Sequence, residues 1–388
     1  MKILIGSPYM MDMRGNSITA KRMIYSLQAR SVDVIGLDYY DTQEVIFHDE
    51  RIFTYDVLHI LNPVRYLSSL AYAKGMHAKV PYGITFTGTD INCHLDRNHS
   101  ELVTLLTEAS FITVFHEQSR QVLLHTLPEL AGRVTIVAQS FFQFNPDLTK
   151  SAESIRHAES SEVPETAGIV QQGSDMLTLI DSYKEAGYTV VILPAGIRKV
   201  KRVPWAIEMF NRFTASHAHK VFLCIVGPEI EQQEARRVEQ LVQTTNNIAY
   251  FREMDHQSVL EAVAAADVLL NCSESEGQSL AIIEAFQLRT PVIASNVPGN
   301  AQMIRHGENG LLFDDESGFR QSLITVIQDK QSIKRLIQNA YEEVQNRYNA
   351  EKEIKCLMQL YENVERGVAN NGEIGCSGND RSVEKAIP

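Results

Sequence analysis

The chain has 388 residues, of which 44% are hydrophobic and 22% charged, the balance of a compact globular protein rather than a disordered one. Its 36 Lys and Arg against 48 Asp and Glu give a net charge of −12, which argues against a broad nucleic-acid-binding surface because such a surface needs many phosphate-neutralising cations. No run approaches the roughly 18 apolar residues of a membrane-spanning helix. The N-terminus, MKILIGSPYMMDMRG, is typical of a first strand rather than a signal peptide. We therefore expect a soluble chain of roughly two to three domain units.

Short aliphatic runs alternate with segments of helical periodicity over residues 1–150. Residues 2–5 form the first run, and Ala20, Met23, Ile24 and Leu27 follow at the spacing of one helix face. Further aliphatic runs lie at 32–37, 57–61, 83–86, 111–115 and 134–137, and a helical stretch lies at 100–109. This alternation predicts a parallel sheet with helices on both faces, so residues 1–150 are expected to form an N-terminal Rossmann-like domain.

A polar stretch interrupts the pattern between about residues 145 and 185 and predicts a linker or insertion at 151–187. Aliphatic runs then resume at 188–193, 221–226, 248–251, 267–271 and 291–294. They predict a second Rossmann-like domain at 188–350, followed by a helix at 351–366 that could pack back on the first domain. Residues 367–388 are rich in Gly, Asn and Ser, which is typical of a disordered tail.

The predicted fold class is α/β, with two doubly wound domains facing across a cleft. Ligands of such domains bind at the carboxyl ends of the strands, so the chemistry should lie in the loops that follow strands. The chain has no GxGxxG, GxxxxGK[ST], DxD or GxSxG motif, which argues against a dinucleotide-dependent dehydrogenase, a P-loop NTPase, a metal-bridged diphosphate site and an α/β-hydrolase. Five cysteines without a CxxC pair argue against a disulfide framework or zinc site and fit a reducing compartment.

The most distinctive loop follows the run at 267–271 and has the sequence CSESEGQS, leading into a helix that begins LAIIEA. It places Glu276 in the loop and Glu284 on the helix, eight residues apart. One interpretation is a solvated loop followed by a favourable acid near a helix start. The other is a ligand site, because Gly277 lets the backbone approach a ligand, the helix N-terminus suits a phosphate, and a carboxylate one turn further on can bind a diol.

A basic loop, AGIRKVKR, follows the first strand of the second domain. It holds four basic residues within five positions at the carboxyl end of a buried strand, namely Arg198, Lys199, Lys201 and Arg202. This arrangement could clamp a diphosphate. It could equally be an exposed basic turn before a helix that begins near Pro204.

The first domain offers two further turns after strands. Gly15 permits a tight passage and Asn16 or Ser17 can cap the next helix, leaving N–H groups toward the cleft, although capping alone would explain these residues. Thr87 and Asp90 lie in the turn TGTD after the run at 83–86 and are candidate cleft residues for an acceptor; a buried structural Asp is the alternative. The twelve histidines form no metal-ligand spacing, so we nominate no metal site and no general base.

Taken together, these residues resemble the glycosyl transferases group one family, a family of retaining, nucleotide-sugar-dependent enzymes with the two-Rossmann GT-B architecture. The Glu-x7-Glu motif of that family is similar to Glu276 to Glu284, preceded by Ser273 and followed by Ala285. The stretches PVIASNVPGN at 291–300 and HGENGLLF at 306–313 are similar to its C-terminal motifs.

The resemblance implies a role for each matching position. Glu276 would contact hydroxyls of the donor sugar, Glu284 would contact the ribose, and Arg198 and Lys201 would neutralise the diphosphate. The catalytic set it implies is Arg198, Lys201 and Glu276. The remaining implied donor contacts come from main-chain or turn positions: Gly15, Asn16, Gly277, Gln278, Ser279 and Leu280.

The chain departs from the family pattern at three places. Gln278 and Ser279 stand where the family usually has Phe-Gly, Arg198 and Lys201 are three rather than five residues apart, and Thr87 stands where a His is common. The combination of GNSITA, FTGTD, AGIRKVK and SEGQSLAIIEA looks more like a small branch that includes glycosyltransferase-one-domain proteins of animals and, more distantly, bacterial selenosugar synthases.

The resemblance implies a metal-independent hexosyltransferase without a cofactor. It would move glucose or N-acetylglucosamine from a nucleoside-diphosphate sugar, expected to be UDP-linked, to an unidentified acceptor with retention of configuration. Alternatives are a non-catalytic nucleotide-sugar-binding or interaction protein, and a sugar-nucleotide epimerase or a phosphorylase of the same architecture. We expect no nucleic-acid partner and a cytoplasmic location, with peripheral membrane association and the oligomeric state left open.

Overall fold

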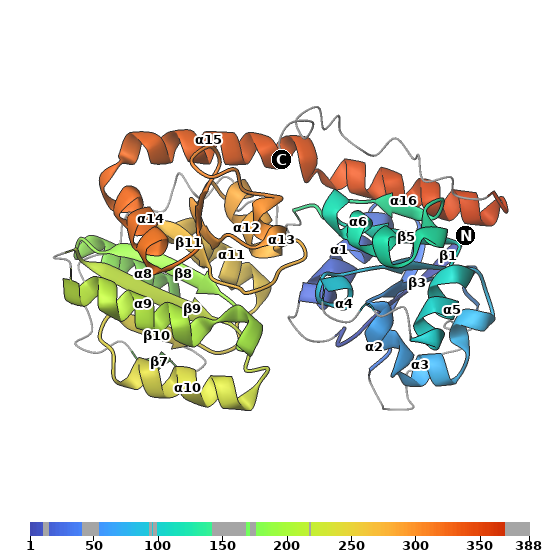
Figure 1. The fold of residues 1–388 in the computed structure, drawn as a ribbon, viewed down its shortest axis with the longest axis horizontal. Helices are drawn as coiled ribbons and strands as arrows, with labels where there is room; N and C mark the ends of the chain where they lie inside the picture. Colours follow the sequence, from blue (N-terminus) through green and yellow to red (C-terminus); the bar gives the residue numbers. More distant parts are fainter. Residues whose placement is uncertain are drawn as a thin grey trace. The chain divides into compact units, whose positions relative to one another are not determined.

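The computed structural model describes residues 1–10, 15–40, 54–92, 95, 99–141, 168–170, 176–216 and 219–368. The chain folds into two units, each with its own parallel sheet (Figure 1). The first unit comprises Met1–Ser140 and Asn346–Pro388, and the second comprises Phe141–Gln345.

The first unit alternates strands with helices along the chain. Its described elements are β1 (Lys2–Ser7), α1 (Gly15–Gln28), β2 (Asp33–Asp38), β3 (Val57–Leu61), α2 (Pro63–Leu67), α3 (Leu70–Ala73), η3 (Met76–Ala78), β4 (Tyr82–Thr85), α4 (Thr89–Asn92), α5 (Ser100–Glu108), β5 (Phe111–Val114), α6 (Glu117–Thr126), η4 (Pro128–Leu130), β6 (Val134–Ile136) and α16 (Ala350–Glu365).

The sheet of the first unit has strand order β2-β1-β3-β4-β5-β6, with every neighbouring pair parallel. Successive side chains on a strand point to opposite faces, so a sheet covered on both faces needs nearly continuous apolar strands. Leu4 and Ile60 lie in the apolar layer that includes residues of α5 and α6. Ile3 and Val57 lie in the layer that includes residues of α1 and α16.

Buried polar groups attach α16 to the rest of the first unit. Arg22 of α1 forms a bidentate ion pair with Glu353 of α16, at 2.7 Å for Nη2–Oε1 and 3.1 Å for Nε–Oε2. His59 of β3 lies 2.6 Å from the hydroxyl of Tyr361 through its Nδ1. Complete burial lowers the pKa of His59 to about 3, so this imidazole is neutral at physiological pH. The last described helix is therefore an integral part of the first unit.

The second unit repeats the alternation. Its elements are β7 (Ile169–Val170), α8 (Met176–Glu185), β8 (Thr189–Pro194), η5 (Lys199–Lys201), α9 (Val203–Ser216), β9 (Val221–Val226), α10 (Gln232–Gln243), β10 (Ile248–Phe251), α11 (His256–Ala265), β11 (Val268–Asn271), α12 (Leu280–Gln287), β12 (Val292–Ser295), α13 (Pro298–Ala301), β13 (Leu311–Phe313), α14 (Glu316–Gln328) and α15 (Lys330–Arg347), the last of which extends past the boundary between the units.

The sheet of the second unit has strand order β13-β12-β11-β8-β9-β10-β7 and is parallel throughout. Every residue of β9 is buried, as expected for a central strand covered on both faces. The chain order runs outward from β8 through β9 and β10 on one side, and through β11, β12 and β13 on the other. The strand order therefore reverses between β8 and β11, which makes the carboxyl ends of these two strands the topological switch point of the unit.

The prediction of two doubly wound, Rossmann-like α/β domains is confirmed, but the predicted boundaries differ from the observed units. The expected linker at 151–187 is wrong for its last part, because β7 and α8 belong to the second unit. The apolar side chains of Met176, Ile180 and Tyr183 are buried at helical spacing along α8, a pattern that the neighbouring polar stretch obscured. Residues 142–167 and the tail from 369 onward lie outside the described residues.

Cys224 and Cys272 are free, whereas Cys356 is disulfide-bonded, which differs from the expectation of reduced thiols.

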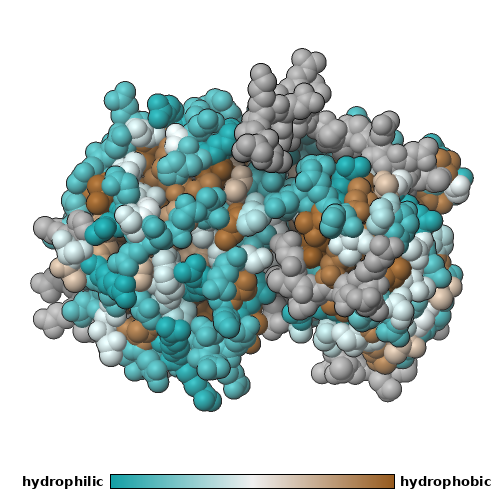
Figure 2. All heavy atoms as spheres, in the orientation of Figure 1, coloured by the Kyte–Doolittle hydropathy of each residue, from teal (hydrophilic) through white to brown (hydrophobic). Residues whose placement is uncertain are grey.

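On the face drawn in Figure 2, hydrophilic residues surround the smaller apolar areas, and the described large apolar side chains with most exposure are scattered. None of the described helices combines the length and apolar character needed to cross a bilayer.

Candidate functional site

Two loops meet at the switch point of the second unit. One loop follows β8 and contains Arg198 and Lys201; the other follows β11 and contains Glu276. The backbone N–H of Glu274 donates to the carbonyl of Val200 at 2.8 Å, so the loops are hydrogen-bonded to each other. Open α/β sheets bind ligands at this position. The structure thus brings two of the predicted catalytic loops together.

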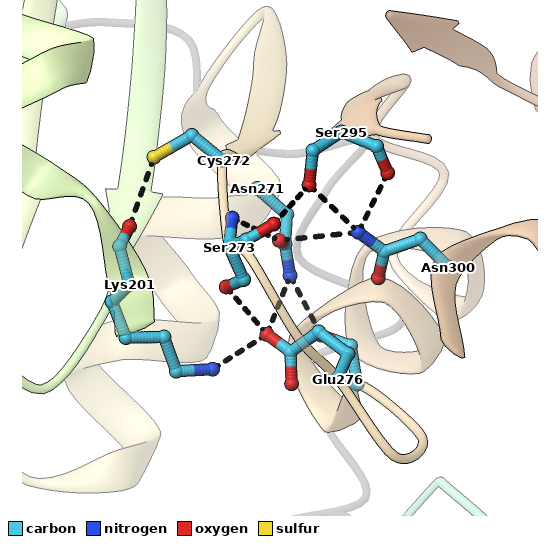
Figure 3. A network of polar contacts seen from close by, with 8 residues as sticks. Lys201, Asn271, Cys272, Ser273, Glu276, Ser295 and Asn300 are labelled. Carbon is cyan, nitrogen blue, oxygen red and sulfur yellow. Dashed lines mark hydrogen bonds and ion pairs between the residues drawn. The ribbon is translucent and has the colours of Figure 1, made fainter. Parts of the chain in front are cut away.

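Cys272 provides a second contact between the same loops. Its thiol donates to the carbonyl oxygen of Lys201 at 3.1 Å (Figure 3). Burial raises the pKa of Cys272 to about 12, although the nearby charge of Arg202 acts in the opposite direction. The thiol of Cys272 therefore stays protonated and can donate this hydrogen bond. The bond holds the backbone of Lys201 in place.

Lys201 and Glu276 form an ion pair at the centre of the site, with Nζ 2.6 Å from Oε1. The same oxygen accepts hydrogen bonds from Ser273 Oγ at 2.7 Å and Asn271 Nδ2 at 3.2 Å (Figure 3). Burial acts to raise the pKa of Glu276, but the charge and hydrogen bond of Lys201 and the two neutral donors outweigh it. The pKa of Glu276 lies below its usual value, so the carboxylate is ionised at neutral pH.

Asn271, the last residue of β11, organises the loop that carries Glu276. Besides donating to Glu276, its Nδ2 donates to Ser279 Oγ at 3.1 Å, and its Oδ1 accepts from the backbone N–H of Ser273 at 3.1 Å and from Asn300 Nδ2 at 3.3 Å. Asn300 also donates to the carbonyl of Ser295 at 3.0 Å. Sequence reasoning gave no role to Asn271 or Asn300, because an isolated Asn side chain carries no pattern of its own; the position of Asn271 at the end of a buried strand was the one available signal.

Gly299 of α13 allows a close approach to the same loop. A Cβ at this position would lie 2.2 Å from the carbonyl oxygen of Glu276 and 2.6 Å from that of Gly277. Both atoms belong to the backbone and cannot rotate away. The helix therefore supports the Glu276 loop only because residue 299 has no side chain.

We expect Gly299→Ala to lower stability by about 1–3 kcal/mol, the cost of overpacking a well-filled site, and to impair the site because the added methyl must displace the backbone of Glu276. The Tm and the affinity for UDP-glucose measure the two effects. Gly132→Ala is the matched control, because a Cβ at Gly132 would meet nothing within 4 Å. Equal effects of the two substitutions would contradict the assigned role of Gly299.

The loop ends at α12, and several of the predicted donor contacts lie at the N-terminal end of this helix. Gly277, Gln278 and Ser279 are buried and precede the helix, and Ser279 is its N-cap residue. Leu280 begins the helix. The N–H groups in the first turn of a helix have no acceptor within the helix, so this end of α12 suits an anion or a sugar hydroxyl.

Glu284 lies one turn inside α12 and is paired with a residue that sequence reasoning missed. Its Oε1 is 2.7 Å from Nε2 of His256, and both side chains are buried. His256 is the first residue of α11, whose start is fixed by Asp255 accepting a hydrogen bond from the N–H of Ser258 at 2.9 Å. A histidine in one helix and a carboxylate in another share no sequence motif, so only the fold brings them together.

Arg198 is half-buried in the loop after β8, three residues before Lys201. The loop is held by the segment after β9, since the N–H of Ile197 donates to the carbonyl of Pro228 at 2.8 Å and the N–H of Lys199 donates to Glu231 at 3.0 Å. Lys199 itself is exposed. The loop thus has a fixed backbone, with Arg198 and Lys201 less exposed than the intervening lysine.

The predicted residues of the first unit lie at the carboxyl edge of its own sheet. Gly15 and Asn16 begin α1. Asp90 is buried and accepts hydrogen bonds from the backbone N–H groups of Thr87, Gly88 and Ile91 at 2.9, 2.7 and 3.1 Å. Burial raises the pKa of Asp90 to about 6 against the opposing effect of these bonds. Asp90 therefore braces the turn that contains Thr87, which is the structural alternative considered for it.

Comparison with known proteins supports the resemblance. Residues 180–343 match the model of the family described as glycosyl transferases group 1. The glycosyltransferase 1 domain-containing protein 1 of Xenopus tropicalis is 25% identical over 357 residues, covering 90% of this chain and 95% of the relative. The N-acetyl-alpha-D-glucosaminyl L-malate synthase of Bacillus anthracis is 27% identical over 190 residues, covering 48% of each chain.

Solved structures agree with this assignment at the level of the fold. Anabaena HepE in complex with UDP-glucose has a TM-score of 0.69 at 17% identity, covering 94% of this chain and all (100%) of that one. Sucrose-phosphate synthase from Thermosynechococcus elongatus has a TM-score of 0.68 at 17% identity, covering 94% and 99%. The resemblance to the group one glycosyltransferases, with two Rossmann-like units, is therefore confirmed.

Proposed function

We propose that this chain, which carries a glycosyl transferases group 1 domain at residues 180–343, transfers a hexosyl group from a nucleoside-diphosphate sugar to an acceptor hydroxyl. The observation that carries the proposal is the pairing of Lys201 with an ionised Glu276 at the switch point of the second sheet. A cation suits a diphosphate, and a fixed carboxylate suits sugar hydroxyls. UDP is the proposed nucleotide and glucose or N-acetylglucosamine the proposed sugar, which agrees with the UDP-glucose bound by the Anabaena neighbour.

The candidate site residues of the second unit contact different parts of the donor. Arg198 and Lys201 bind the diphosphate, Glu276 binds hydroxyls of the donor sugar, and Glu284, oriented by His256, binds the ribose diol. Main-chain N–H groups from Gly277 to Leu280 complete the donor site. Gly15 and Asn16 of the first unit stay predicted donor contacts.

The chemical step places negative charge on the leaving nucleoside diphosphate. The bond between the anomeric carbon and the phosphate oxygen breaks, and a bond from the same carbon to the acceptor oxygen forms. The acceptor proton passes to the departing diphosphate, so configuration is retained when both bonds lie on one face of the sugar. Arg198 and Lys201 supply the positive charge at the leaving group that a metal ion supplies in other enzymes. We propose metal-independent catalysis on that basis.

Ligand-induced stabilisation tests the donor site. A ligand that binds only the folded protein raises its Tm, so UDP-glucose or UDP-N-acetylglucosamine at millimolar concentration should do so. Because a carboxylate accepts strong hydrogen bonds from a diol, Glu284→Ala should weaken UDP binding by about tenfold or more. Glu342→Ala, at an exposed position of α15, is the control and should bind UDP like the wild type.

The thermal-shift assay, combined with product analysis after incubation with UDP-sugars, separates the proposed enzyme from its alternatives. No change in Tm with any nucleotide or nucleotide sugar would refute a donor site. Binding without transfer or hydrolysis of the sugar would favour a non-catalytic nucleotide-sugar-binding protein, for which the Gln278-Ser279 departure is the motivating feature. Interconversion of two UDP-sugars without an acceptor would identify an epimerase.

A further inference from the structure

The first unit has a switch point of its own, from which the proposed donor site takes only Gly15 and Asn16. Its strand order reverses between β1 and β3, because β2 lies on the other side of β1 and β4 follows β3. Tyr9 follows β1, Tyr40 follows β2, and Arg65 lies in α2, directly after β3. The three residues therefore gather at the carboxyl edge of the sheet, where open α/β sheets bind ligands.

The two tyrosines form a fixed aromatic pair at this edge. Their rings stack with centroids 5.0 Å apart and planes at 28°. The backbone N–H groups of Tyr9 and Tyr40 both donate to Oδ1 of Asp38, at 3.1 and 3.0 Å. Neither ring is fully buried. One carboxylate thus positions both rings, and partly exposed aromatic rings of this kind suit the apolar face of a sugar.

Arg65 adds a positive charge beside the rings. Its Nη1 donates to the hydroxyl of Tyr9 at 3.0 Å, and its guanidinium carbon lies 5.4 Å from the centroid of the same ring. The side chain is half-buried, and in the described part of the chain it forms no ion pair. A guanidinium has five N–H donors in a fork that matches phosphate or carboxylate oxygens, and the Tyr9 contact uses one of them.

The contrast with Arg22 in the same unit shows what an internally satisfied arginine looks like. Arg22 forms a bidentate ion pair with Glu353 and donates to Gln139 at 3.3 Å. Arg65 contacts the hydroxyl and the ring of Tyr9, and no carboxylate among the described residues forms an ion pair with it. Such an arrangement is suited to binding an anion from outside the chain.

We propose that Tyr9, Tyr40 and Arg65 form a recognition site for a sugar or polyol that carries a phosphate or carboxylate group. Arg65 binds the anionic group, and the tyrosine rings pack against the carbon skeleton. Insofar as this molecule is the glycosyl acceptor, the inference depends on the proposed function and narrows the acceptor to an anionic class.

Titration of the full chain with three matched probes tests the proposal. D-glucose 6-phosphate, D-glucuronate and neutral D-glucose share a ring and differ in charge, so the first two distinguish a phosphate from a carboxylate ligand. At least one anionic probe should bind more tightly than D-glucose, and Arg65→Gln should abolish that preference, with a loss of about tenfold or more. Tyr40→Ala should weaken binding of charged and neutral probes alike, because it removes a ring and no charge.

Arg120→Gln is the matched control, since Arg120 lies in the same unit and pairs with Glu117 at the surface. It should bind all three probes like the wild type. If Arg65→Gln does not fold, Arg65→Lys replaces it; the lysine keeps the charge but loses the fork and should retain only part of the preference. The proposal is overturned if D-glucose binds as well as both anions, if Arg65→Gln or Arg65→Lys leaves the preference unchanged, or if Arg120→Gln lowers it equally. If UDP-glucose raises the Tm but no anion is preferred, the donor site is supported and the Arg65 site is refuted. If an anion is preferred but UDP-glucose does not change the Tm, the Arg65 site is supported and the donor site is refuted.

Discussion

Lys201→Met should lower kcat by about 100- to 1,000-fold, the usual cost of removing one preorganised group that stabilises developing charge. Methionine keeps the aliphatic stem and removes the ammonium, which lies 2.6 Å from Glu276. The expected loss is in kcat rather than in KM, because the charge on the diphosphate increases as the sugar leaves. Initial rates of UDP-sugar transfer or hydrolysis under saturating donor measure it.

The adjacent lysine provides the matched control for this prediction. Lys199 is exposed in the same short helix, so Lys199→Met changes the same net charge without touching the Lys201–Glu276 pair. Its kcat should stay within about threefold of the wild-type value, because the free energy of one solvated surface interaction is of that size. Arg198→Ala should resemble Lys201→Met. Wild-type turnover in both Arg198→Ala and Lys201→Met would remove these residues from the mechanism.

Glu276 links this prediction to the electrostatics of the site. Its pKa lies below the usual value because Lys201, Ser273 and Asn271 together outweigh the effect of burial. Lys201→Met removes the largest of these opposing contributions, so the pKa of Glu276 should rise. The variant should accordingly lose activity at a higher pH than the wild type as the pH falls. A pH profile of kcat/KM checks this shift separately from the loss of turnover.

The contrast between Glu276 and its supporting residues shows what the sequence could predict. Glu276 and Glu284 were found because eight residues of local spacing, a glycine and a helix start fall in one segment. By contrast, Asn300 donates a hydrogen bond to Asn271, which is 29 residues away in the sequence, and His256 contacts Glu284, which is 28 residues away. Such contacts depend on which strands become neighbours, and no local pattern encodes that choice. The strands could be predicted because they do have a local pattern: a strand buried on both faces needs a continuous apolar run.

The first unit shows the same limit at a larger sequence separation. A helix near residues 351–366 could be predicted from periodicity, but not the residue that Glu353 would meet. Its partner Arg22 lies 331 positions earlier. Two ionisable residues in amphipathic helices normally face solvent, so neither signals burial by itself. Only the folded unit shows that both charges are enclosed.

Glu353→Gln should destabilise the first unit by about 3–5 kcal/mol, the cost of leaving one partner of a buried ion pair without its counter-charge. The side chains of Arg22 and Glu353 are 1% and 4% exposed, so water cannot replace the lost carboxylate. Glu353 also accepts the backbone N–H of Ser140 at 3.1 Å, which ties the end of the N-terminal segment to α16. The substitution should therefore loosen α1, α16 and the segment near Ser140 together.

Unit-specific probes measure this loss. Trp205 is the single tryptophan and lies in the second unit, so its fluorescence reports unfolding there, while hydrogen exchange of peptides from α1 and α16 reports the first unit. Glu351→Gln is the control: its side chain is 83% exposed and pairs with Arg30 at 3.6 Å, so a change of only about 0–1 kcal/mol is expected. The double substitution Arg22→Met with Glu353→Leu should recover much of the lost stability, since an apolar pair leaves no buried charge. Equal protection in Glu353→Gln and Glu351→Gln would show that the pair does not hold α16 in place.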